Sequence, residues 1–400
     1  AEAGLAGLEG DLIALAQKTR NRAILTGLFS FFGSRVQGGL EERALLALEE
    51  WDREDTATVL AAIDYLGKLK AGSAAPVLRA LIDAGEARFT NAAIRALGRI
   101  GGALAGEAAA DIAVYLINYY ETRYPGDETR REILLALGDV RDPGAVLFLA
   151  EIASDSGVGL GIGTAALEAL AGIGDERGLE AVLAALSSTN PNLRSAAVAA
   201  LGPFNGPAVD DAILEAFRDA YYRTRIAAAQ AAGQRKLSAA VPYLGYRAEH
   251  DEVAAVREEA VRALGAIATG EARAILERIL LDRKNTERIR ILAADMLVLD
   301  GGAPYAGKLI AELEWAKTSN LTNLYNGLLK AASTLVSPEM EALAGRLLAG
   351  GNVVEKSYAL DMVANNRFMS LIEAVRTLTD PKNGSLAPKA QATLEKLGVS

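Results

Sequence analysis

One histidine and no cysteine are available for catalysis or metal binding in this chain. The absence of cysteine excludes disulfides, thiolate metal sites and a cysteine nucleophile. His250 has no second histidine to complete a zinc or iron site, and no nucleophile motif lies near it. We therefore expect His250 to be a surface turn residue, and the chain to have no metal site, no cofactor and no catalytic residues.

The stretch "SGVGLGIGTAA", residues 156–166, places Gly161, Gly163 and Ala166 in a G-x-G-x-x-A spacing. That spacing binds a dinucleotide when a strand precedes it and a helix follows, because the backbone amides then meet the pyrophosphate. The preceding residues "GAVLFLAEIA" have the composition of a helix instead. We interpret residues 157–163 as a flexible loop within one structural unit, with a hinge role as a further possibility, and not as a cofactor site.

Adjacent carboxylates could in principle serve as an acid and a base. The pairs Asp210 with Asp211 and Glu258 with Glu259 are each one residue apart. Consecutive residues point to different faces of a helix, so neither pair can converge on one substrate atom. We expect surface or capping charges.

The positions of these residues depend on a motif that recurs through the chain, as in "VREEAVRALG" at residues 256–265. Its final glycine serves as a marker, and successive markers are separated by 31, 40, 33, 31, 31, 32 and 33 residues. A period between about 20 and 50 residues is typical of a solenoid. The markers or their equivalents are Gly67, Gly98, Gly138, Ala171, Gly202, Gly233, Gly265 and Val298.

Two columns of apolar residues accompany the marker. One residue before it is Leu in seven of eight copies, as at Leu66 and Leu97, and five residues before it is Ala in seven of eight, as at Ala62 and Ala93. A spacing of four places both columns on one helical face. The small Ala allows a neighbouring helix to approach closely, and the Leu fills the space beside it, as stacked helices require.

An arginine recurs eight residues before the marker, for example at Arg225, Arg257 and Arg290, although Thr90 and Gly163 replace it elsewhere. An arginine at the start of a helix can reach a carboxylate or carbonyl in the preceding turn. Asp219 and Asp251 each lie six residues upstream of an arginine of this column. We expect a ladder of pairs from one unit to the next, with solvated surface arginines as the alternative.

Helix-start signals lie between the markers. Asp followed by Pro in "DPGAVLFL" at 142–149 and Ser-Pro in "SPEMEAL" at 337–343 each restart a helix, and "NP" at 190–191 opens the second helix of its unit. Weaker copies continue with markers at Val336, Ala364 and Gly398. We predict about eleven helix-turn-helix units: an N-terminal helical cap at 1–39, regular repeats at 40–300, and divergent repeats with a cap at 301–400.

The arginine at the start of the second helix, the small-residue column and "LGDVRDPGA" at 137–145 resemble HEAT repeats, specifically the short HEAT-like repeats of the phycobilin-lyase type. The resemblance covers most of the chain. It implies an all-α fold, a right-handed α-solenoid or superhelix whose second helices line the concave side. It also implies, as a remote alternative, a lyase-like or chaperone-like activity.

Aromatic residues gather in two places. Four of the twelve tyrosines lie in the repeat of 40 residues, and Phe29, Phe31 and Phe32 lie near the start. Packing of a lengthened outer helix is favoured for the tyrosines, with partner contact as the alternative. The phenylalanines are expected to close the open end of the stack, or else to contact a partner or membrane. The tyrosines are Tyr115, Tyr119, Tyr120 and Tyr124.

Composition limits the class of partner. A net charge of -9 has the wrong sign for a protein that neutralises phosphates, so nucleic acid is not expected. The stretch "ILTGLFSFF" at 24–32 is far shorter than the roughly 20 residues of a membrane span. The lack of cysteine and the start at Ala1 favour an exported or periplasmic protein, with a cytoplasmic location as the alternative.

The positions three and seven residues before the marker should face the concave side, and their residue types vary from copy to copy. A mixed surface with isolated aliphatic residues suits a protein or peptide ligand. The sequence thus predicts a non-catalytic protein-binding scaffold or adaptor, with a structural subunit of a larger assembly, joined through its ends and the Tyr115 to Tyr124 bulge, as the alternative. The predicted contact residues are Asn91, Arg95, Arg131, Glu168, Gln230, Glu258, Arg262 and Asp295.

Overall fold

The computed structural model describes residues 8–299 and 302–399, which form helices and turns and contain no strand. The predicted all-α solenoid is therefore confirmed for the described residues. The chain forms two compact units, residues 1–212 and 213–400. Residues 1–7 of the predicted cap, and the predicted boundary at 300 and 301, lie outside the described residues.

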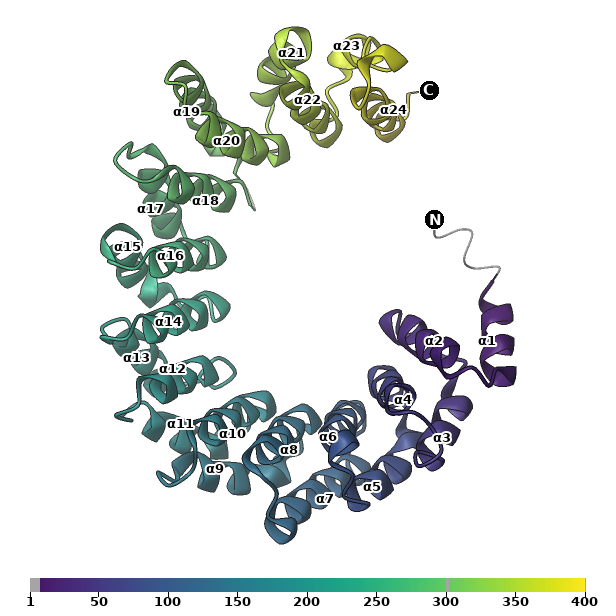
Figure 1. The fold of residues 1–400 in the computed structure, drawn as a ribbon. Coiled ribbons are helices and arrows are strands. Elements are labelled where there is room, and N and C mark those ends of the chain that lie inside the picture. Colours follow the sequence, from purple (N-terminus) through teal and green to yellow (C-terminus); the bar gives the residue numbers. More distant parts are fainter. Residues whose placement is uncertain (1–7, 300–301, 400) are drawn as a thin grey trace. The chain divides into compact units, whose positions relative to one another are not determined.

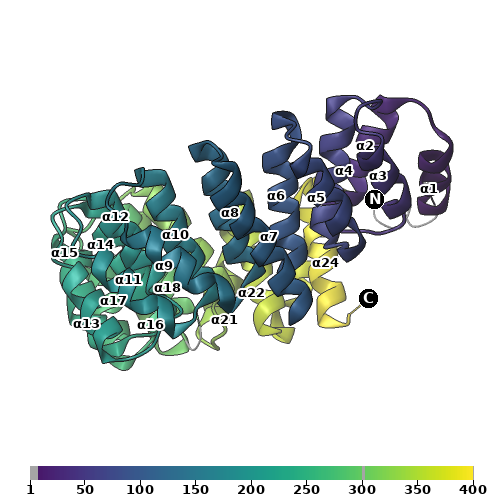
Figure 2. The ribbon, with the colours of Figure 1, turned by 90° about the horizontal axis from the view of Figure 1, so that it is seen from below.

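The first unit has two layers of helices (Figure 1). The second helices lie on the inner side of this unit's curve, and α4, α6 and α8 run side by side when seen from below (Figure 2). The first helices are α1 (Glu9–Lys18), α3 (Glu41–Glu49), α5 (Ala75–Asp83), α7 (Glu107–Arg123), α9 (Val146–Ser154) and α11 (Leu179–Ala185). The second helices are α2 (Arg22–Ser34), α4 (Thr56–Leu69), α6 (Ala87–Gly101), α8 (Asp127–Val140), α10 (Leu160–Ile173) and α12 (Pro191–Ala200).

The second unit repeats this arrangement, and α13 (Pro207–Ala216) crosses the division between the units. Its first helices are α15 (Val241–His250), α17 (Gly270–Leu281), α19 (Ala306–Thr318), α21 (Met340–Gly350) and α23 (Ile372–Arg376). Its second helices are α14 (Tyr222–Gln234), α16 (Ala254–Ile267), α18 (Glu287–Val298), α20 (Thr322–Thr334), α22 (Val353–Asn366) and α24 (Leu386–Leu397). Counted in chain order from α3 through the described residues, the helices make eleven pairs, as predicted.

The helix-start signals act as expected. The Asp142 carboxylate accepts a hydrogen bond of 2.8 Å from the amide of Gly144 and caps a single 3-10 turn, Pro143–Ala145, from which α9 continues. The Asn190 side chain accepts a hydrogen bond of 3.0 Å from the amide of Asn192 and caps α12, whose first residue is Pro191. Both signals satisfy amides that a helix start leaves unpaired.

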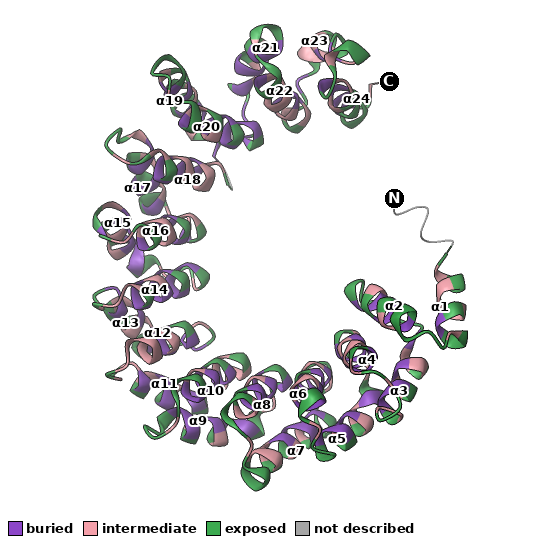
Figure 3. Ribbon diagram, in the orientation of Figure 1, coloured by how far each residue is buried: buried purple, intermediate pink, exposed green. Residues whose placement is uncertain are grey.

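The core of each unit lies where its two layers meet (Figure 3). Both apolar columns are buried along their whole length, from Ala62 and Leu66 to Ala293 and Leu297. Phe29 and Phe32 are also buried, and the Phe29 ring stacks on Tyr65 of α4 at 5.8 Å between centroids. These phenylalanines therefore join α2 to the rest of the inner layer.

Consecutive second helices touch where the marker glycines lie. A Cβ on Gly98 would lie 2.8 Å from the Cα of Ala136, and one on Gly138 would lie 2.8 Å from the Cα of Ala169. These distances are too short for any side chain larger than hydrogen. The glycine is thus required by the approach of the next helix backbone, which explains why the motif recurs.

Two sequence interpretations were wrong. Gly161 and Gly163 belong to α10, and the loop between α9 and α10 consists of residues 155–159 alone. Gly163 is buried, and a Cβ there would lie 3.3 Å from the Leu193 side chain of α12, so this glycine takes part in helix packing. Val336 is also out of register as a marker, because it is exposed and follows the end of α20.

We predict that Gly138→Ala lowers the free energy of unfolding by about 1–3 kcal/mol, because the new methyl group meets the backbone of α10. Gly27→Ala is the matched control, since Gly27 lies within α2 with nothing within 4 Å of a Cβ. That change should stabilise the protein by about 0.5–1 kcal/mol. Urea unfolding of both variants measures the difference, and equal effects would contradict the packing explanation.

Candidate protein-binding face

The predicted contact residues lie on the exposed side of the second helices, which we call the inner face of each unit. Asn91 and Arg95 on α6, Arg131 on α8 and Glu168 on α10 belong to the first unit. The second unit contributes Gln230 on α14, Glu258 and Arg262 on α16, and Asp295 on α18. The structure brings several of these together around two shallow grooves.

The first groove runs along α6, α8 and α10 and has a volume of about 320 Å³. Ala136, Gly138, Ala169 and Gly172 form its floor, so the helix contact described above also creates the hollow. Predicted contact residues Arg95 and Glu168 both line it. A floor without long side chains leaves the backbone of two helices close to any bound chain.

Charges of both signs border the first groove. The carboxylate of Glu132 is nearly buried and lies 3.5 Å from Arg95 Nε and 3.5 Å from Arg131 Nη1. No hydrogen bond or ion pair joins the exposed Glu168 side chain to any other described residue. Asn91 does not line the groove. Its Oδ1 accepts a hydrogen bond of 2.8 Å from Thr129 Oγ1.

Asp64 extends this charged border to α4. Its carboxylate lies 2.7 Å from Lys68 Nζ and 3.1 Å from Arg99 Nη1. Partial burial acts to raise the pKa of Asp64, but the hydrogen bonds from Lys68 and Arg99 outweigh it and hold this pKa below its usual value. Asp64 is therefore a fixed negative charge beside the groove.

The second groove, about 430 Å³, lies between α14 and α16. Gly233, Ala263 and Ala266 are again among its lining residues, and Gln230 with Gln234 border it from α14. Arg262 borders it from α16 and pairs with Glu259 at 2.8 Å. The two grooves therefore share one construction in separate units.

Glu258 and Asp295 lie beyond the lining of the second groove. Hydrogen bonds from Arg288 are the largest influence on Glu258 and lower its pKa, while partial burial opposes them. Asp295 is half-buried on α18, where burial raises its pKa and the charge of Lys330 opposes the shift only partly. The predicted site residues are thus only partly assembled into grooves.

Several residues that line the grooves were not predicted from the sequence: Arg99, Glu132, Gln234 and Glu259. Arg99 and Gln234 stand one residue after the marker, and Glu132 and Glu259 stand six before it. The repeat alignment therefore contained the signal, in two columns that had not been assigned to the face. Residues six before the marker share a helical face with those three before it, because residues three apart are neighbours on a helix.

The tyrosine cluster mainly packs between neighbouring first helices. The Tyr115 hydroxyl donates to Asp83 Oδ1 at 3.2 Å, and the Tyr120 ring meets Phe148 edge to face at 5.2 Å. Burial, followed by the nearby Asp83 carboxylate, raises the pKa of Tyr115. Packing of a lengthened α7, which includes Tyr119, is thus confirmed, while Tyr124 is 79% exposed.

His250 is the last residue of α15 and is exposed, as expected of a surface residue. Among residues 8–299 and 302–399, no group of three His, Asp or Glu side chains is placed to hold a metal ion. No helix in the described part of the chain is both long and apolar enough to cross a bilayer.

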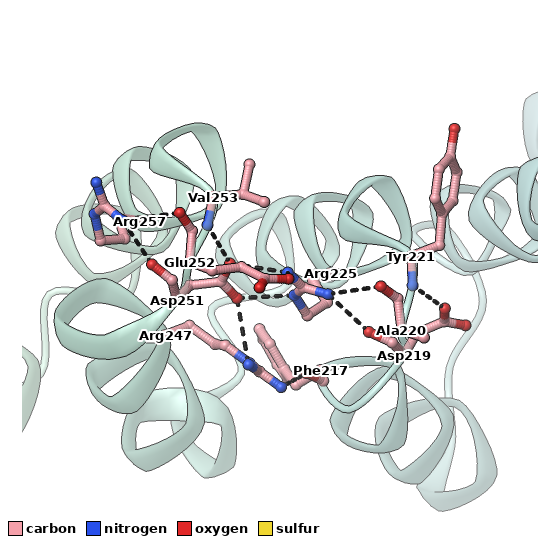
Figure 4. A network of polar contacts seen from close by, with 10 residues as sticks. All are labelled: Phe217, Asp219, Ala220, Tyr221, Arg225, Arg247, Asp251, Glu252, Val253 and Arg257. Atoms are coloured by element: carbon pink, nitrogen blue, oxygen red, sulfur yellow. Dashed lines mark hydrogen bonds and ion pairs between the residues drawn. The ribbon is translucent and has the colours of Figure 1, made fainter.

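An arginine ladder connects neighbouring repeats of the second unit (Figure 4). Arg225 Nη1 donates to the carbonyls of Asp219 and Ala220 at 2.9 and 3.1 Å, and Nε and Nη2 donate to the carboxylate of Asp251 at 2.8 and 2.9 Å. Arg257 in turn donates to the carbonyl of Asp251 at 2.6 Å. The predicted contact is confirmed at Arg194, Arg225 and Arg257, each of which donates to a carbonyl of its own preceding turn, and Arg225 also holds the carboxylate of Asp251 from the next repeat. It is not made at Arg130, whose Nε has no hydrogen-bond partner among the described residues.

A variant of this contact occurs at Arg290, which is almost completely buried on α18. Its Nε donates to the carbonyl of Leu280 at 2.8 Å, and its Nη2 pairs with the carboxylate of Glu312 on α19. The partner here comes from a first helix rather than a turn. The sequence spacing of the other copies could not indicate Glu312.

The repeats match a known family over almost the whole chain. The sequence pattern described as "Spirochaete HEAT repeat protein" matches residues 4–393. The chain belongs to this HEAT-repeat family. No match to a curated protein was found.

Solved HEAT-repeat structures share the fold. Kap121p aligns with a TM-score of 0.51 and 14% identity, covering 99% of this chain and 50% of that one. Kap121p bound to the extreme C-terminus of the protein phosphatase Cdc14p aligns with a TM-score of 0.52 and 13% identity, covering 98% and 49%. This HEAT-repeat chain therefore spans about half the length of the karyopherin structures that it matches.

We predict that Asp251→Asn destabilises the protein on the order of 3 kcal/mol at neutral pH, because it removes the only buried carboxylate paired with Arg225 among the described residues and leaves that arginine the exposed Glu252 at 3.7 Å. Burial acts to raise the pKa of Asp251, but hydrogen bonds from Arg225 and Val253 lower it overall. The stability from this pair is therefore complete above the unfolded-state pKa of about 3.9 and is lost as the pH falls through the lower folded-state pKa.

Urea unfolding of the wild type and the variant at pH values from neutral to acidic measures this prediction. The stability difference should shrink below about pH 4. Glu314→Gln is the control, because its pair with Arg346 at 2.9 Å is exposed and should contribute less than about 1 kcal/mol. A difference that stays constant with pH would contradict the ionised pair.

Proposed function

We propose that this chain is a non-catalytic scaffold that holds a protein partner on the inner face of its second helices. The observation that carries this proposal is the pair of grooves with Gly and Ala floors and bordering charges of both signs. A shallow groove with mixed charge suits an extended or helical segment of another protein, because it offers several hydrogen-bonding groups and little enclosed volume.

Two further features support a protein ligand. Glu168 presents a carboxylate without an ion pair or hydrogen bond among the described residues, so its charge is available to a partner. Gln230 and Gln234, four residues apart on α14, present amide groups that can both donate to and accept from a peptide backbone. Karyopherin Kap121p, which shares the fold, has been solved bound to the SUMO protease Ulp1p.

The predicted organisation into a cap at 1–39, regular repeats at 40–300 and divergent repeats at 301–400 stays part of this proposal. In it, the regular repeats carry the contact residues and the end segments protect the apolar faces of the stack. A lyase-like activity has only the resemblance of the repeats behind it, and we do not include it.

We expect the combined variant Arg95→Ala, Glu168→Ala and Arg262→Ala to bind the partner with an affinity at least tenfold lower. This corresponds to a loss of about 1.4 kcal/mol of binding free energy or more. These residues border the two grooves. Affinity capture of the tagged chain after mild crosslinking, read by mass spectrometry, identifies the partner, and titration of that partner measures the affinities.

The control variant, Glu180→Ala, Arg278→Ala and Arg346→Ala, makes the same change in charge on the first helices α11, α17 and α21. It should bind as the wild type does, and circular dichroism should show equal helicity for both variants. Equal affinity of the two variants for the captured partner would remove the inner face from the proposal.

A second candidate function, a building block of a larger assembly, has one observation in its favour. Val114 on α7, Tyr124 at its end and Leu147 on α9 are 56%, 79% and 66% exposed. Exposed apolar side chains on neighbouring helices are typical of a contact surface. This surface lies on the first helices and is separate from the grooves.

If the second candidate is correct, the wild type should self-associate with increasing concentration. The combined variant Val114→Ser, Tyr124→Ser and Leu147→Ser should then remain monomeric, because it removes exposed apolar area without changing charge. Sedimentation velocity over a range of concentrations measures this. A wild type that is monomeric at the highest concentration would count against the assembly.

A further inference from the structure

A separate pocket lies on the first-helix side of the second unit, away from the grooves. It is lined by Phe217, Arg218, Pro242, Tyr243, Tyr246 and Arg247, and its volume is about 330 Å³. Nearly all of its exposed lining is apolar. This volume is at the lower end of the range for ligand pockets and fits one large side chain better than a cofactor.

Aromatic rings form the walls of the pocket. Tyr243 and Tyr246 lie three residues apart on α15 and therefore share one face of the helix. Phe217, which is buried, stacks against Tyr243 with 5.8 Å between centroids and an interplanar angle of 23°. Tyr246 is 60% exposed, so a large aromatic surface remains available to a ligand.

The arginine ladder holds one side of the pocket in place. Arg247 donates to the carbonyl of Phe217 and, at 3.3 Å, to the carboxylate of Asp251 (Figure 4). Asp251 is itself fixed by Arg225. The pocket is therefore preorganised, which reduces the entropy that a ligand must overcome on binding.

The charge around the pocket selects the ligand. Two of the six lining residues are arginines and none is acidic, although the chain carries a net charge of -9. Arg218 lies over the Tyr243 ring at 5.9 Å, and its partner Glu215, at 2.6 Å, forms an exposed pair with it. Such an exposed pair contributes little stability, so a ligand carboxylate can replace Glu215.

We propose that this pocket binds an aromatic side chain of a peptide segment that carries an adjacent Asp or Glu. The aromatic ring lies against Tyr243 and Tyr246, and the carboxylate pairs with the guanidinium of Arg218. A basic peptide is excluded by the two arginines, and a purely aliphatic peptide leaves Arg218 without a ligand charge. The occupant is thus an acidic, aromatic segment of a partner protein.

A displayed library of random short peptides, selected on the full chain and counter-selected on the Tyr246→Ala variant, tests the proposal. The selected peptides should be enriched in Phe, Tyr or Trp next to Asp or Glu. Fluorescence polarisation of the most enriched peptide then measures its affinity. Tyr246→Ala should weaken binding about tenfold or more, and Arg218→Ala about threefold to tenfold with a reduced dependence on salt.

Tyr246→Phe keeps the ring and should bind as the wild type does. Tyr124→Ala is the control, because it removes an even more exposed tyrosine, which lies in the first unit and outside this pocket. Both side chains are exposed, so neither variant is expected to affect folding. Selection of basic or purely aliphatic peptides, selection of no peptide that depends on Tyr246, or an affinity unchanged by Arg218→Ala would overturn the proposal. None of these results bears on the grooves of the inner face.

Discussion

The contact between consecutive second helices is the constraint on which the rest of this structure depends. At Gly98 and Gly138 the next helix comes so close that a single methyl group would meet its backbone. The glycine and the alanine opposite it therefore recur together along the chain. Because neither residue has a long side chain, the same contact leaves the shallow grooves of the inner face.

The second contact between neighbouring repeats is polar. Arg225 satisfies two carbonyls of its own turn and one carboxylate of the next, and Arg290 makes an equivalent contact with Glu312. Buried ion pairs often contribute little net stability, because removing the two charges from water is costly. Their geometry is specific, however, since a guanidinium with several fixed partners defines how one repeat is set against the next.

The two proposed binding surfaces use these contacts differently. The grooves form because the glycine and alanine positions carry no long side chains. Their charged borders vary from repeat to repeat. The pocket beside Tyr246 depends on an additional contact, because Arg247 extends the arginine ladder from Asp251 to the carbonyl of Phe217. In both cases the repeated residues provide the framework, and the residues that differ between repeats determine the chemistry of binding.

The amino-acid sequence by itself determined the helices, their pairing into repeats, the buried columns and the contact of Arg225 and Arg257 with their preceding turns, because these depend on spacing within one or two helices. It did not reveal that Gly163 is buried within a helix, because this glycine packs against Leu193 on a neighbouring helix. Left-handed backbone conformations end α4, α8 and α16 at Lys70, Arg141 and Ala268, residue types that give no such signal. Only the tertiary structure decided these features, because they arise from the packing of one helix against another. For the same reason, only the tertiary structure placed Phe217 and Tyr246 in one pocket.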